Sequence, residues 1–153
     1  MLREMGILKN NMPGTEHDEQ ACFIQWLATL YPQYPELRLG YAIINGAKLP
    51  YSRNKKGERF SREATRLKAE GLTPGIPDWC LPCPRGIYHG LYIELKHGNN
   101  KPSANQRAVL RGLANQGYRV AVAWEFEGMQ RALLDYLLLP GSGKVEGKIE
   151  EYK

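Results

Sequence analysis

The segment Leu91–Lys96, in the middle of the chain, alternates apolar and polar side chains. Successive side chains of a β-strand point to opposite faces, so the two leucines and the isoleucine share one face. Tyr92, Glu94 and Lys96 share the other face. The apolar face predicts a strand that packs on a core, and the polar face places a carboxylate beside an ammonium group near the strand end at His97-Gly98.

A hairpin is predicted around this strand, which we expect to extend over residues 87–96. A second strand is predicted at 78–81, and the five residues between them, Pro82 to Gly86, have the composition of a turn. In an antiparallel pair the neighbouring strand can bring Asp78 beside Glu94. Two carboxylates and a lysine would then converge on one small volume.

The remaining elements indicate the fold class. Helices are predicted at about 16–31, 61–69, 103–117 and 129–138, and further strands at 37–44 and 118–124. The order of these elements predicts an α/β fold with a mixed central β-sheet flanked by helices.

The length of 153 residues fits one compact domain. We assign 1–14 to a flexible N-terminus, 15–139 to the single domain and 140–153 to a mobile C-terminal tail. The apolar stretches are far shorter than a membrane span, and the N-terminus lacks the design of a signal peptide. We therefore expect a soluble, cytoplasmic protein that makes no membrane contact.

Positive charge is concentrated in residues 47–71, here named the basic excursion. The net charge is +5, and this segment holds eight basic and three acidic residues, so it carries the excess of the whole chain. Such charge runs are usually solvated surface, but they also supply sequence-independent contacts to the phosphates of nucleic acids. The candidate contact residues are Arg53, Lys55, Lys56, Arg59 and Arg62.

Two carboxylates and a lysine are suited to phosphodiester hydrolysis. Carboxylate oxygens bind Mg²⁺, which neutralises phosphate charge and acidifies water, while a lysine can orient that water and stabilise the transition-state anion. A bare Glu-x-Lys pair is also compatible with an exposed ion pair on an edge strand, so the pair alone is not specific.

The wider pattern resembles a known family. Pro77-Asp78, followed after fifteen residues by Glu94-Leu95-Lys96, resembles the PD-(D/E)xK nuclease motif. Together with the later Ser103-x-x-Gln106 and Gly117-Tyr118-Arg119-Val120, and with Glu16 and Gln20 near the N-terminus, it resembles the VRR-NUC family over about residues 15–138. The resemblance implies a restriction-endonuclease-like core and a nuclease domain at 15–139.

The resemblance also implies roles for individual residues. Glu16, Asp78, Glu94 and the main-chain carbonyl of Leu95 would surround Mg²⁺ or Mn²⁺, with Lys96 as the catalytic lysine. Gln106 would support the site, although it could equally be only the third residue of a helix-capping box. Glu19 lies one helical turn from Glu16 and stays open as the N-terminal carboxylate.

The activity implied is a metal-dependent DNA endonuclease. No helix-turn-helix or zinc finger is visible, so we expect recognition of backbone and shape rather than base sequence. Stand-alone members are similar to small virus-encoded nucleases, which would act in the host cytoplasm, and branched DNA such as a four-way (Holliday) junction is the expected substrate. Cutting two opposed strands calls for two sites and hence a two-fold homodimer. The sequence leaves open RNA versus DNA, the symmetry of cleavage and the physiological cation.

Two alternative functions remain. The first is a catalytically inactive DNA-binding module that keeps the fold. The second is a zinc-dependent scaffold built on Cys80-x-x-Cys83, which would need further ligands such as His89 and Cys22. An odd number of cysteines in a chain without an export signal favours reduced thiols.

The three tryptophans, Trp26, Trp79 and Trp124, are expected in the core rather than on a surface that stacks on bases.

Overall fold

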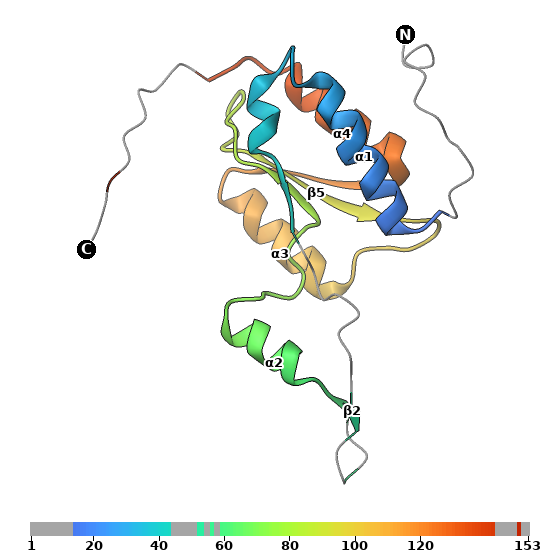
Figure 1. Ribbon diagram of the computed structural model, residues 1–153. Helices are drawn as coiled ribbons and strands as arrows, with labels where there is room; N and C mark the ends of the chain where they lie inside the picture. Colours follow the sequence, from blue (N-terminus) through green and yellow to red (C-terminus); the bar gives the residue numbers. More distant parts are fainter. Residues whose placement is uncertain (1–13, 44–51, 54–55, 57–58, 143–149, 151–153) are drawn as a thin grey trace.

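The computed structural model describes residues 14–43, 52–53, 56, 59–142 and 150 (Figure 1). The predicted flexible N-terminus and most of the predicted mobile tail lie outside these residues, as does Lys55. No helix in the described ranges is both long enough and apolar enough to cross a bilayer.

The central sheet has four strands in the order β1 (Tyr41–Ala42), β4 (Trp79–Leu81), β5 (Leu91–Lys96) and β6 (Arg119–Trp124). The first three are antiparallel neighbours. Strand β6 runs parallel to β5, because the chain crosses over between them through helix α3 (Ala104–Asn115). This mixed sheet confirms the predicted α/β class.

Helices α1 (Glu16–Leu30) and α4 (Glu125–Leu137) lie side by side on one face of the sheet, and α3 lies on the other (Figure 1). The face under α1 and α4 holds the predicted apolar side of β5. The side chains buried there from the strands are Trp79, Leu81, Leu91, Ile93, Leu95 and Ala123. The alternation of β5 therefore separates a core face from a polar face.

Aromatic side chains fill the middle of this core. Phe23 of α1 meets Trp79 edge to face at 5.2 Å, and Trp26 meets Phe126 of α4 in the same way at 6.2 Å. Trp26 and Trp79 are almost completely buried, as expected, whereas Trp124 is 43% exposed. The core prediction was therefore wrong for Trp124.

The predicted hairpin is present, but β5 begins at Leu91 rather than at residue 87. Residues 82–90 instead form a longer connection that Arg85 fixes in place. Its guanidinium pairs with Glu36 at 2.6 Å and donates to the carbonyl of Leu137 at 2.9 Å. These tertiary contacts keep residues 82–90 from extending the hydrogen-bonded ladder of β4 and β5.

The predicted strand at 37–44 is mostly wrong. Pro35–Leu39 forms a 3₁₀ helix, η1, because proline favours the first turn of a helix and this turn buries Leu37 completely. Only Tyr41–Ala42 forms strand, after Gly40, where an added Cβ would lie 2.4 Å from the Trp79 ring. Glycine is thus required by close packing at this position.

Helix α4 begins at Glu125, four residues earlier than predicted. The chain passes from β6 into α4 without a loop, through a positive φ of 60° at Glu125. The boundaries of α1, α3 and β6 agree with the predictions to within about two residues.

The basic excursion projects from the sheet (Figure 1). Strands β2 (Ser52–Arg53) and β3 (Arg59–Phe60) pair antiparallel, and Ser61 caps helix α2 (Arg62–Ala69), which buries none of its residues. The excursion leaves the sheet after Ile43, whose N–H donates to the carbonyl of Asp78 at 2.8 Å.

The chain returns through Pro74, whose carbonyl accepts a hydrogen bond from the Asn105 side chain of α3 at 2.8 Å. One end of the projecting segment is therefore attached to Asp78 and the other to Asn105 of α3.

Candidate active site

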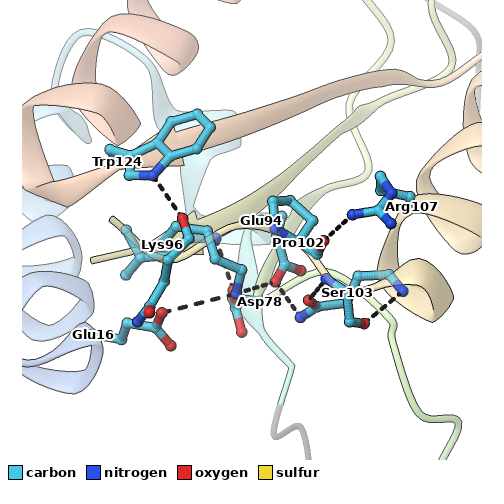
Figure 2. Close-up of polar contacts among 11 residues, drawn as sticks. Glu16, Asp78, Glu94, Lys96, Pro102, Ser103, Arg107 and Trp124 are labelled. Atoms are coloured by element: carbon cyan, nitrogen blue, oxygen red, sulfur yellow. Dashed lines mark hydrogen bonds and ion pairs between the residues drawn. The ribbon is translucent and has the colours of Figure 1, made fainter. Parts of the chain in front are cut away.

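Asp78 lies one residue before β4, where the ladder with β5 ends. The last backbone partners are Trp79 and Ile93, and beyond them the Asp78 carboxylate accepts the Leu95 N–H at 2.8 Å. The Asp78 carboxylate thus accepts a hydrogen bond that a backbone carbonyl would accept if the β4–β5 ladder continued. This bond fixes Asp78 beside the end of β5 that carries Glu94 and Lys96 (Figure 2).

Glu94 and Lys96 form a buried ion pair on the polar face of β5. Glu94 has no exposed surface and Lys96 is 7% exposed. The Lys96 Nζ lies 2.6 Å from Glu94 Oε1, and the Gln106 side-chain amide of α3 donates to the same oxygen. The second oxygen, Oε2, is buried without a hydrogen-bond partner.

Glu16 reaches this pair from the first turn of α1. Its Oε1 lies 3.8 Å from Lys96 Nζ, and its side chain is 42% exposed. The structure therefore brings Glu16 of α1 and Glu94 of β5 to the same lysine, and Asp78 lies at the neighbouring Leu95 (Figure 2).

Glu19 points elsewhere. Its Oε2 accepts the backbone N–H of Phe126 at 2.8 Å, at the first turn of α4, where Trp124 provides no side-chain cap. A carboxylate is favoured at this position because the N-terminal N–H groups of a helix lack partners and carry partial positive charge. Of the two glutamates, Glu16 is the one that faces Lys96.

The pKa of Glu94 is raised from 4.5 to about 7. Burial is the main cause, because it disfavours the charged carboxylate. The hydrogen bond from Lys96 opposes the shift, while the negative charges of Asp78 and Glu16 add to it. Added positive charge near Glu94 would therefore stabilise its ionised carboxylate.

Gln106 makes the capping hydrogen bond and also contacts Glu94. Its carbonyl oxygen accepts the N–H of Ser103 at 2.9 Å, which completes a capping box, and its amide nitrogen donates to Glu94. One amide group therefore links the start of α3 to the buried carboxylate. The neighbouring Asn105, which no sequence pattern marked, holds the loop before Asp78 through the Pro74 carbonyl.

The oxygen donors here suit a hard divalent cation. Glu94 Oε2 is a buried acceptor without a hydrogen bond, and Leu95 directs its N–H, and with it its carbonyl, toward the Asp78 edge. In the described part of the chain no three His, Cys, Asp or Glu side chains already form a cage, and Lys96 lies between Glu94 and Glu16. Carboxylate and carbonyl oxygens are the type of ligand that Mg²⁺ or Mn²⁺ prefers, so the chemistry of these donors is compatible with either ion.

The two cysteines of Cys80-x-x-Cys83 are buried and free. The Cys83 thiol lies 3.6 Å from the carbonyl of Glu36, and burial raises its pKa. The described ranges contain no cluster of three potential zinc ligands around either thiol. The geometry therefore gives the zinc alternative no support.

The basic excursion presents Arg53, Lys56 and Arg62 at the surface. The side chain of Arg59 lies outside the described residues, although its backbone belongs to β3. Arg66, in contrast, is paired within α2, with Glu63 at 2.7 Å and Glu70 at 3.3 Å.

Comparison with known proteins agrees with this geometry. The family model of the VRR-NUC domain matches residues 15–124. A solved structure described as a VRR_NUC domain protein is similar with a TM-score of 0.65 and 25% identity, over 86% of this chain and 94% of that chain. None of the curated proteins gives a significant match. The family has a nuclease-type, DNA-related function, and the chain belongs to the VRR-NUC domain family.

Proposed function

We propose that the protein is a metal-dependent DNA endonuclease whose active site is formed by Glu16, Asp78, Glu94 and Lys96. The observation that carries the proposal is the buried Glu94–Lys96 pair at 2.6 Å, joined by two further carboxylates at the end of β5. Burial of an ion pair is weak evidence for a stabilising role, because desolvation offsets the attraction. A catalytic role explains its presence better.

Each residue has a defined task in this proposal. Glu16, Asp78, Glu94 and the Leu95 carbonyl would hold the cation, and Gln106 keeps Glu94 oriented through its amide. When bound, Mg²⁺ or Mn²⁺ would neutralise charge on the scissile phosphate and make a coordinated water more acidic.

Lys96 sits beside Glu94, where its ammonium can orient the attacking water and stabilise the negative charge that develops on the phosphate.

We further propose that the substrate is branched DNA, such as a four-way junction, and that the protein acts as a two-fold homodimer. The exposed arginines and lysine of the basic excursion support contact with phosphates outside the cut position. Two opposed cuts need two sites, which a two-fold dimer provides.

The first experiment compares cleavage of labelled four-way junction, flap and duplex DNA in Mg²⁺, in Mn²⁺ and in EDTA. We expect metal-dependent products from the junction. Folded protein that cuts none of the substrates with either metal would refute the enzymatic proposal. Sedimentation of the same sample gives the oligomeric state.

Substitution of Lys96 distinguishes the hypothesis of an active enzyme from that of an inactive DNA-binding module. Lys96→Ala removes a preorganised charge, so we expect a fall in kcat on the order of 100- to 1,000-fold with junction binding retained. Arg131→Ala, at an exposed position of α4, is the matched control and should cut like the parent. Equal rates for parent and Lys96→Ala would remove Lys96 from the mechanism.

A further inference from the structure

Trp124 is the last residue of β6 and lies beside the candidate active site. In the parallel ladder it is the register partner of Lys96, so both side chains leave the sheet on the same face from adjacent strands. Trp26 and Trp79 are buried in the core, whereas Trp124 is 43% exposed. A large aromatic side chain is therefore open to solvent next to the lysine.

The exposed indole is held in one orientation. Its Nε1–H donates to the carbonyl of Asn100 at 2.9 Å, and its backbone forms the N-cap of α4. Because the only polar atom of the ring is already bonded, the indole has no donor with which to read the edge of a base. It offers a flat apolar face.

From these observations we infer that Trp124 stacks on an unpaired base of the DNA strand whose phosphate lies at Lys96. The inference rests on the proposed nuclease function and specifies its substrate class: DNA with an unpaired or splayed nucleotide at the cut. A base inside an intact duplex is stacked on both sides and cannot offer its face. Stacking on an aromatic side chain is tolerant of base identity, which agrees with recognition without base sequence.

Neighbouring strands are about 5 Å apart, so the indole lies within reach of a base attached to a phosphate bound at Lys96. The exposed basic side chains of the excursion would hold the backbone further along the strand.

The test combines a protein variant with a modified substrate. Cleavage is measured for parent and Trp124→Leu on junctions in which one nucleotide at a time near the mapped cut is abasic. At one position we expect the abasic substitution to lower kcat/KM of the parent by roughly 5- to 100-fold. The same substitution should have little effect on Trp124→Leu, because the ring is already missing.

Trp124→Phe is the conservative variant. It keeps a flat ring, so it should show most of the loss of kcat/KM that the abasic substitution causes in the parent. An abasic penalty of the same size in parent and Trp124→Leu at every position would overturn the stacking inference. So would a change in the sedimentation coefficient of DNA-free Trp124→Leu, which would show that the ring covers a second copy of the chain.

A binding measurement keeps this test separate from the proposed activity. With 2-aminopurine at the same position and no divalent cation, we expect fluorescence quenching by the parent and none by Trp124→Leu. Absence of cleavage by the parent would refute the nuclease proposal. The quenching result still decides the stacking, because 2-aminopurine can be placed at each position around the branch point in turn without a mapped cut. Equal quenching by the two proteins would refute the stacking alone.

Discussion

The Glu94 carboxylate is buried against one lysine and one glutamine side chain, with two further acids nearby. Such a group is easier to keep neutral than charged, which is why its pKa is raised to about 7. Protonation relieves the repulsion from Asp78 and Glu16, and a bound cation would relieve it as well. Either a proton or a cation at Glu94 would thus be favoured by the negative charges around it.

This shift predicts how stability depends on pH in EDTA. The folded protein holds a proton on Glu94 from pH 4.5 to about 7, whereas the unfolded chain has released it. The stabilising contribution is therefore fully present below pH 4.5 and is lost progressively as pH rises to about 7, by on the order of 3 kcal/mol in total.

We expect the free energy of unfolding of the parent, measured in urea, to fall relative to that of Glu94→Gln between pH 5 and pH 8. A difference that does not change with pH would mean that Glu94 titrates like an ordinary carboxylate.

The two N-terminal glutamates give a matched pair of variants. Glu19→Ala removes the acceptor of the Phe126 N–H and should destabilise the protein by about 1 kcal/mol. Glu16→Ala should change stability much less but lower cleavage and the apparent affinity for Mn²⁺, because Glu16 faces Lys96. Urea unfolding and cleavage assays of both proteins check this, and a reversed pattern would make Glu19 the functional acid.

At the scale of residues, the sequence predicted that Asp78, Glu94 and Lys96 lie at the same end of the hairpin. It did not predict the protonation of Glu94 or the individual contacts of each side chain. The spacing of Asp78, Glu94 and Lys96 depends on strand periodicity, which is a local property. The choice between Glu16 and Glu19 depends on where α4 begins, and the exposure of Trp124 depends on what covers the end of β6. Both features depend on tertiary contacts, which local sequence patterns do not predict.

At the scale of elements, the first turn of α3 joins the two halves of the site. Ser103 caps the helix, Asn105 holds the Pro74 carbonyl before Asp78, and Gln106 holds Glu94. One helix start therefore fixes both the loop and the strand that carry the acids.

Variants of the capping box separate folding from function. Ser103→Ala and Gln106→Ala each lose one capping hydrogen bond, so we expect each to lower the free energy of unfolding by about 1 kcal/mol. Only Gln106→Ala also removes the donor to Glu94, and its kcat should fall at least tenfold. Equal cleavage by the two variants would leave Gln106 with a capping role alone.

Long periodic elements were predictable and short ones were not. Helices α1 and α3 have capping boxes and apolar faces that mark their limits. The short stretch 37–44 was predicted as a strand, but burial of Leu37 and the contact of Gly40 with Trp79 favour a helical turn at its start. Packing between distant segments thus overrides local preference where an element is short.

At the scale of the whole molecule, the α/β class followed from the order of elements, whereas the spatial separation of the basic excursion did not. The excursion projects beyond the sheet and buries none of the side chains of α2. Charge alone indicated an anionic partner. Where these charges lie relative to the acids became visible only in three dimensions.

The projecting charges predict a specific salt dependence. Arg53→Ala with Arg62→Ala should weaken DNA binding and reduce the slope of log K against log salt by about 1 per lost phosphate contact, with kcat unchanged at saturating DNA. Arg66→Ala is the control, because its charge is already paired with Glu63 and Glu70. An unchanged slope in the double variant would exclude these arginines from the DNA contact.

The two attachment points of the excursion, at Ile43 and Pro74, also bear on how such proteins diversify. A segment inserted between two anchored positions can be exchanged, shortened or extended by evolution, or by a protein engineer, while the catalytic framework stays intact. Under the proposed function, the DNA contacts made by the excursion could therefore change without a change in Glu16, Asp78, Glu94 or Lys96.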